Sequence, residues 1–157
     1  MKFTFTEENL KRIEQVRKKY PTALAAVMPV IYIAQEQNGF ISNEVMEEIA
    51  NVLDIDKVNV LSVVTFYTMY HTKPMGKYHV QVCTNVSCML RGAYEIFDLV
   101  KDKLGIENMQ VTQDGKFSLE EVECMGACGG APMIAINEDY YENLTKEKVE
   151  EILDSLK

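Results

Sequence analysis

All four cysteines of the chain lie in its second half, in two close pairs. Cys83 and Cys88 form a C-x4-C pair, and Cys124 and Cys128 form a C-x3-C pair within the segment CMGACGGAP. The first pair begins where an alternating, strand-like segment ends, and the second pair precedes a short apolar segment. Loops at the ends of strands can meet at one edge of a sheet. The spacing therefore favours a fold that gathers four thiols into one site.

Three kinds of site use four cysteines in this way. A structural zinc site with four thiolates is possible, but C-x4-C together with C-x3-C is loose for it. A disulfide scaffold is typical of small secreted chains, whereas this one can bury a real core. A 2Fe–2S cluster suits the wider spacing, because each pair can bind one iron. We therefore expect Cys83, Cys88, Cys124 and Cys128 to hold a 2Fe–2S cluster, and a structural zinc interaction module remains the alternative.

Three glycines surround the second pair, namely Gly126, Gly129 and Gly130. Because glycine has no side chain, the backbone at these positions can approach a cluster and direct N–H groups at sulfur. Such hydrogen bonds tune the potential of an iron–sulfur centre. A tight turn alone would also use them. His71 and His79 lie outside both cysteine loops, so neither is expected to be a ligand.

The first half of the chain, residues 1–75, has helical periodicity throughout. One helix is capped by Thr6 and ends before Pro21, and a third and a fourth are expected over residues 43–53 and 57–69. The second helix, over residues 23–37, is apolar around most of its circumference and contains Pro29, which should kink or split it. Such a helix is either central in a bundle or part of a docking surface.

The second half, residues 76–157, mixes strands with helices and follows the turn-rich segment 73–76. The pattern predicts a strand over 78–82, a helix over 90–104, a hairpin of 110–112 and 116–123 around Asp114-Gly115, a strand over 133–136 and a last helix capped by Thr145. The fold class is therefore α+β, a helical bundle followed by an α/β domain, with the order β-α-β-β-β-α.

Charge and motifs exclude several classes of function. The 157 residues include 24 acidic and 16 basic ones, a net charge of −8, which does not suit nucleic acid or an anionic membrane. The most apolar stretch, residues 23–34, is too short to span a bilayer, and the N-terminus has no signal-peptide pattern. A cytoplasmic protein is expected. No glycine-rich phosphate motif appears, so hydride chemistry on a nucleotide should belong to another chain.

The motif C-x4-C followed by C-M-G-A-C-x-x-A-P, after a helical half, resembles a known family. It is similar to the thioredoxin-like 2Fe–2S subunit of NADH dehydrogenase (complex I), a module also used by electron-bifurcating, NAD(P)-linked hydrogenases and some formate dehydrogenases. The resemblance covers nearly the whole chain. Its segments are IAQEQNGFIS, VVTFYTMY, GKYHVQVCTNVSC and ECMGACGGAPMIAIN.

The resemblance implies a thioredoxin-like domain with a mixed sheet after residue 76, and ligands at the four cysteines already named. It also implies a large partner subunit that carries FMN and the NAD(H) site, with further iron–sulfur subunits in the same complex. This chain would then be a non-catalytic subunit that exchanges single electrons with the partner's flavin. A stand-alone thioredoxin-like ferredoxin is a second alternative. The bond between Ala131 and Pro132 is expected to be cis, as thioredoxin-like folds often have a cis-proline there.

Overall fold

The computed structural model describes residues 2–156 and contains two compact units. One unit ends at Pro74 and the other begins at Met75, a break that falls inside the turn-rich segment 73–76. The first unit is helical, and the second holds every strand found among the described residues. The α+β class is therefore confirmed. No helix within residues 2–156 is both long and apolar enough to cross a membrane.

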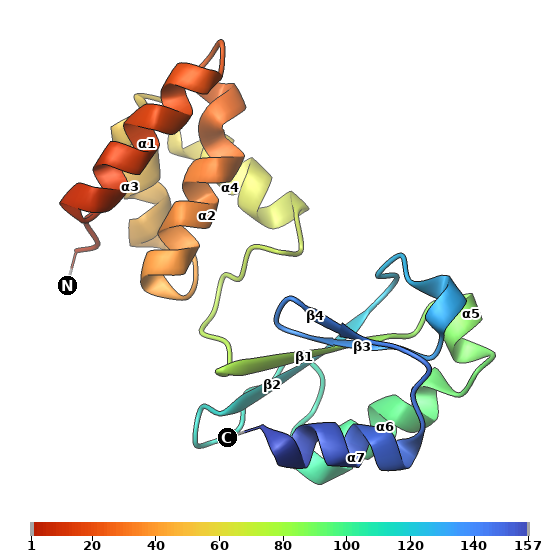
Figure 1. The fold of residues 1–157 in the computed structure, drawn as a ribbon. Coiled ribbons are helices and arrows are strands. Elements are labelled where there is room, and N and C mark those ends of the chain that lie inside the picture. Colours follow the sequence, from red (N-terminus) through yellow and green to blue (C-terminus); the bar gives the residue numbers. More distant parts are fainter. Residues whose placement is uncertain (1, 157) are drawn as a thin grey trace. The chain divides into compact units, whose positions relative to one another are not determined.

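The first unit is a bundle of helices joined by short turns (Figure 1). Its first and third helices begin at side-chain caps, since Thr6 accepts from the N–H of Asn9 and Ser42 accepts from that of Val45. The elements are α1 (Glu7–Lys19), a 3-10 turn η1 (Leu24–Ala26), α2 (Val27–Asn38), α3 (Asn43–Leu53) and α4 (Lys57–Phe66).

The apolar helix α2 is the centre of this bundle. It packs against α1, α3 and α4, and it buries Val30, Ile31 and Ala34 completely. Its broad apolar surface is therefore explained by a central position rather than by docking. The helix predicted over residues 23–37 is split, as expected, into the 3-10 turn η1 and helix α2, and the division at Ala26 and Val27 comes just before Pro29. Pro29 is in the first turn of α2, where a backbone N–H has no partner within the helix, so the ring is accommodated.

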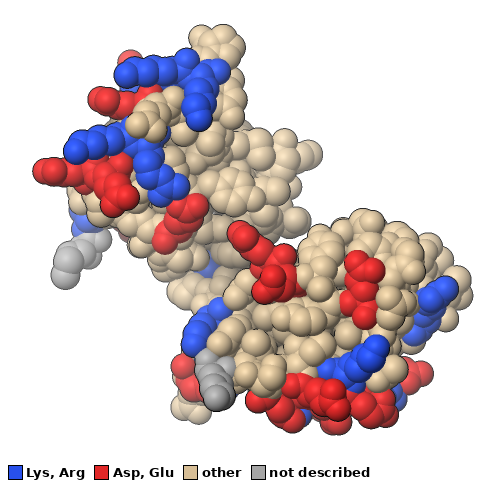
Figure 2. Space-filling model, in the orientation of Figure 1, with Lys and Arg blue, Asp and Glu red and all other residues tan. Residues whose placement is uncertain are grey.

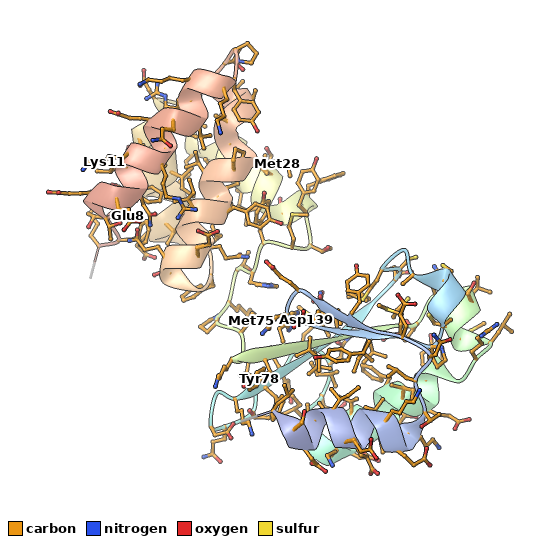
Figure 3. All side chains as sticks on the ribbon, in the orientation of Figure 1. Glu8, Lys11, Met28, Met75, Tyr78 and Asp139 are labelled. Carbon is orange, nitrogen blue, oxygen red and sulfur yellow. The ribbon has the colours of Figure 1, made fainter. Side chains whose placement is uncertain are left out.

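The outer surface of the bundle differs between its first and last helices. Charged side chains gather over α1, from which Glu8 and Lys11 project into solvent (Figures 2 and 3). Helix α4 ends at Phe66, earlier than the expected Met69, and leaves the Phe66 side chain 76% exposed. The Phe66 ring makes an edge contact with Tyr67, with 4.9 Å between the ring centroids.

The second unit is a four-stranded mixed sheet with helices against one of its faces (Figure 1). The strand order is β2-β1-β3-β4, in which β1 is parallel to β2, and β3 is antiparallel to both β1 and β4. The strands are β1 (Tyr78–Cys83), β2 (Phe117–Val122), β3 (Ile134–Ile136) and β4 (Asp139–Tyr141). The helices are α5 (Val86–Met89), α6 (Ala93–Leu104) and α7 (Lys146–Ser155), and η2 (Cys128–Gly130) is a 3-10 turn.

The core of the second unit lies between the sheet and helices α6 and α7. Alternate residues of β1, β2 and β3 face the helices, because side chains alternate across a strand. The buried set includes Val80, Val82, Phe117, Leu119, Ile134 and Ile136 from the strands, and Ile96, Val100, Val149 and Leu153 from the helices. Figure 2 shows acidic side chains along the outer side of α7, which fits an amphipathic helix.

The sequence-based description of this half needs three corrections. Residues 110–112 form only an isolated bridge between Val111 and Ser118, although the turn around Gly115 is present with a positive φ of 70°. A fourth strand, β4, follows a turn at Asn137, where φ is 56°. The predicted helix 90–104 begins only at Ala93, because Gly92 before it has a left-handed φ of 88°, and a separate short helix, α5, precedes it at Val86–Met89.

The other face of the sheet carries a buried polar cluster. The imidazole of His79 on β1 is buried, with Nδ1 2.9 Å from the Ser118 Oγ and Nε2 2.8 Å from a Glu120 carboxylate oxygen. The same Ser118 oxygen accepts the N–H of Gly76 at 3.1 Å. These bonds tie the chain entering β1 to β2, because both strands contribute to one network.

No side chain fits at Gly76, so replacing this glycine should destabilise the second unit. A Cβ at this position would collide with the backbone of Phe117 and Ser118. We expect Gly76→Ala to reduce the free energy of unfolding by about 1–3 kcal/mol, as other overpacked sites do. Urea denaturation followed by circular dichroism measures the change. In the matched variant Gly129→Ala the new Cβ meets no atom within 4 Å, so its stability should be closer to wild type. Equal midpoints for Gly76→Ala and wild type would contradict this account.

Candidate metal centre

The first cysteine pair is buried at the carboxyl end of β1. Cys83 is the last residue of the strand, and Cys88 lies in the short helix α5. Both side chains are almost fully buried, at 2% and 1% exposure. They share an apolar cluster with Ala93, Ala131 and Met133. The pair thus faces a water-poor environment inside the second unit.

Burial has a direct effect on the acidity of Cys88. It raises the pKa of this thiol to about 11, and a hydrogen bond with the neighbouring Cys83 thiol acts in the same direction. The charge of a Cys128 thiolate also raises it. A negatively charged thiolate raises the pKa of a neighbouring thiol because like charges repel. A bound cation would relieve that repulsion, since metal ligation requires deprotonated sulfur.

The second pair lies in the loop between β2 and β3. Cys124 follows the end of β2 closely, and Cys128 begins the η2 turn. Both side chains are exposed, and all four cysteines of the chain are free thiols. The N–H of Gly126 donates to the Cys124 sulfur at 3.4 Å, in a turn where Gly126 has φ of 76°. One backbone N–H therefore points at a candidate ligand sulfur.

Strand pairing brings the two cysteine loops to one end of the sheet. In the parallel β1–β2 ladder Cys83 is opposite Val122, and the Cys83 Sγ is 4.0 Å from the carbonyl oxygen of Glu123. The next residue is Cys124. The structure therefore brings the Cys83 and Cys88 thiols into contact, and Cys128 is close enough for its charge to raise the pKa of Cys88. Cys124 directly follows Glu123, whose carbonyl the Cys83 Sγ contacts. Within residues 2–156 no group of three or more His, Cys, Asp or Glu side chains is arranged to hold a metal ion.

The loop that carries the second pair is held by residues that the sequence pattern did not single out. The Tyr140 hydroxyl on β4 donates to the Met125 carbonyl at 3.1 Å. The Arg91 guanidinium donates to the Ala131 carbonyl at 3.3 Å. The bond between Ala131 and Pro132 is cis, as the sequence predicts. The sequence gives no pattern that singles out Tyr140, because β4 is too short to show the alternation of a strand.

The donor set fits an iron–sulfur cluster. Thiolate is the soft ligand that both iron–sulfur clusters and zinc take. The apolar surroundings of Cys83 and Cys88, and the N–H directed at Cys124, match what tunes such a cluster. The remaining glycines, Gly129 and Gly130, lie in the η2 turn, where Gly130 donates its N–H to the Ala127 carbonyl at 3.0 Å.

A mixed sheet with helices against one face, a cis-proline before β3 and two cysteine-bearing loops at one end of the sheet are the features of a thioredoxin-like iron–sulfur protein. Residues 13–157 match the sequence model of the thioredoxin-like 2Fe–2S ferredoxin family. The chain therefore belongs to that family, as the sequence indicates, and the expected fold class is confirmed.

Curated relatives extend over the whole chain. A subunit of the NADH-quinone oxidoreductase of Rickettsia bellii is 47% identical, over 99% of this chain and 95% of the relative. The mitochondrial NADH dehydrogenase (ubiquinone) flavoprotein 2 of Dictyostelium discoideum is 44% identical, over 99% of this chain and 64% of the relative. Among solved structures, an NAD+-reducing NiFe-hydrogenase in its air-oxidised state has the same fold with a TM-score of 0.70, over 80% of this chain and 22% of that chain at 14% identity.

The unequal burial of the four thiols predicts unequal reactivity. In cluster-free protein, Cys124 and Cys128 should react with iodoacetamide faster than Cys88 at pH 8, because the thiolate is the nucleophile and Cys88 has a pKa of about 11. A raised pKa means that Cys88 stays protonated until the pH approaches that value. Peptide mass spectrometry after timed alkylation measures each rate, and unfolding in guanidinium should abolish the difference. Labelling of Cys88 as fast as Cys124 in the folded protein would show that the site is not buried as described.

Proposed function

We propose that this chain is the 2Fe–2S electron-transfer subunit of an NADH–quinone oxidoreductase. The observation that carries the proposal is the meeting of two cysteine loops at one end of the sheet, in a chain that matches an iron–sulfur family over residues 13–157. The relatives that match end to end support the kind of complex, because their names are those of NADH–quinone oxidoreductase subunits.

The chain's own residues supply binding and environment. Cys83, Cys88, Cys124 and Cys128 would be the ligands, and a bound 2Fe–2S cluster supplies one-electron redox chemistry. The apolar packing around Cys83 and Cys88 excludes water from one side of the site. The Gly126 N–H stabilises negative charge on the Cys124 sulfur. Gly129 and Gly130 let the backbone turn closely around Cys128.

Hydride transfer belongs to a partner in this proposal. A two-electron donor such as NADH needs a nucleotide site and a flavin to split its electron pair, and this chain has no glycine-rich nucleotide motif. A partner subunit would bind FMN and NAD(H), and this chain would accept electrons from the flavin singly. It is therefore a non-catalytic subunit, part of a cytoplasmic complex that lies at the membrane without inserting itself.

The two halves of the chain divide this work. We assign the 2Fe–2S site to a thioredoxin-like domain over residues 76–157 and contacts with other subunits to a helical domain over residues 1–75. Helix α4 and the residues just after it expose several large apolar side chains, which supports a contact role for the helical domain because apolar patches mark interaction sites; they are Val58, Leu61, Phe66 and Met69. The hydrogenase with the same fold indicates that the fold is not restricted to one type of complex.

Replacing a ligand should remove the cluster. We expect Cys128→Ser to lower iron and acid-labile sulfide several-fold, because a serine hydroxyl is a poor ligand for this soft centre. Iron and sulfide analysis of the anaerobically purified protein, with its visible spectrum, provides the measurement. Ala127→Ser is the matched control, since it adds the same hydroxyl one residue away in the same loop. Unchanged iron and sulfide in Cys128→Ser would remove this residue from the ligand set.

The division of labour predicts what the isolated chain does not do. The purified chain should show no NADH oxidation with ferricyanide as acceptor, whereas the native complex should be active. Size-exclusion chromatography of the native extract should place this chain with a flavin-containing protein. A chain that migrates alone would favour the stand-alone ferredoxin. Steady NADH turnover by the pure, flavin-free chain would reveal a nucleotide site on this chain and contradict the proposal.

A further inference from the structure

The segment that follows β4 is bonded directly to the loop that carries Cys128. The N–H of Asn143 donates to the Gly130 carbonyl at 2.6 Å, and that of Leu144 donates to the Pro132 carbonyl at 3.1 Å. Asp139, labelled in Figure 3, marks the start of the strand that leads into this segment. These backbone bonds fix the residue between β4 and Asn143, which is Glu142, beside the ligand loop.

The Glu142 side chain lies across Gly130. A Cβ at Gly130 would collide with a Glu142 carboxylate oxygen and would be 2.5 Å from Cδ and 2.7 Å from Cβ of the same side chain. At the neighbouring Gly129 a Cβ would meet no atom within 4 Å. Gly130 is therefore the position whose missing side chain admits the Glu142 carboxylate, and Gly129 is not.

A cation is held on the same loop. The Arg91 guanidinium donates to the carbonyl of Ala131, the residue after Gly130, at 3.3 Å. Lys148 donates to the carbonyl of Asn143, the residue after Glu142, at 3.2 Å. Two side chains of opposite charge thus lie against the loop that holds Cys128. Arg91 is hydrogen-bonded to the loop backbone, and Glu142 is packed against Gly130.

We propose that Glu142 sets the reduction potential of the iron–sulfur site, and that Gly130 is required as glycine because it admits this carboxylate. The inference rests on the proposed function. Reduction adds one electron to the oxidised cluster, and no bond forms or breaks. A fixed carboxylate disfavours the added negative charge and lowers the potential, whereas Arg91 acts in the opposite direction.

The decisive variant is Glu142→Gln, which keeps the shape of the side chain and removes its charge. At the potential where the wild-type cluster is half reduced, the ratio of reduced to oxidised cluster should rise about threefold, which is about 28 mV at 59 mV per tenfold for one electron. Because Glu142 is exposed, the shift should shrink as salt is added. Dithionite titration of the anaerobically purified full chain, read by EPR, measures the ratio.

Three further variants separate charge from structure. Gly130→Ala should displace the carboxylate and shift the potential upward, and combining it with Glu142→Gln should add little, because both changes remove the same interaction. Arg91→Gln should shift the potential downward, opposite to Glu142→Gln, which general loosening of the site would not do.

The outcomes distinguish this inference from the proposed function. A wild-type protein without a 2Fe–2S spectrum would overturn the proposed function and this inference together. A normal wild-type cluster with an unmoved or lowered midpoint in Glu142→Gln would overturn the inference alone. If Glu142→Gln and Glu142→Lys both lost their clusters while the wild type kept it, Glu142 would be structural, and its role in setting the potential would be contradicted.

Discussion

The parallel pairing of β1 with β2 is the contact on which the site depends. It places the end of the Cys83 strand opposite Val122, so the chain leaving β2 reaches the first cysteine pair within a few residues. The antiparallel pairing of β1 with β3 brings the other end of the second cysteine loop to the same edge, where the N–H of Cys83 meets the Met133 carbonyl. A shift of one residue in either ladder would turn Cys83 to the opposite face of the sheet.

The site is asymmetric in its exposure to water. Cys83 and Cys88 are buried among apolar side chains, whereas Cys124 and Cys128 lie in an exposed loop. Burial disfavours the charged thiolate of the first pair, and the open loop supplies an N–H for the second. One side of the site is thus shielded, and the other is accessible to an electron donor. The surrounding chain is acidic, with a net charge of −8, so the local charges on the loop matter for the potential.

Much of the fold could be predicted because the signals are local. Caps at Thr6 and Ser42, the alternation of β1 and the cysteine spacing are readable without tertiary information. The misses arise where tertiary context decides. The proline alone does not show where the helix around Pro29 divides, which is at Val27. Strand β4 is too short for periodicity and exists because β3 pairs with it. Glu142 carries no signal in sequence, since its contact with Gly130 depends on how the chain returns to the loop.

The central claim is that four thiols from two loops hold a two-iron cluster. The most direct test is metal and acid-labile sulfide analysis of the anaerobically purified, full-length wild-type protein, combined with EPR before and after dithionite. The account predicts about two irons and two sulfides per chain, a red-brown oxidised protein without a signal, and an EPR signal that appears only on reduction. A colourless protein with about one zinc per chain, bound by the same cysteines, would contradict it.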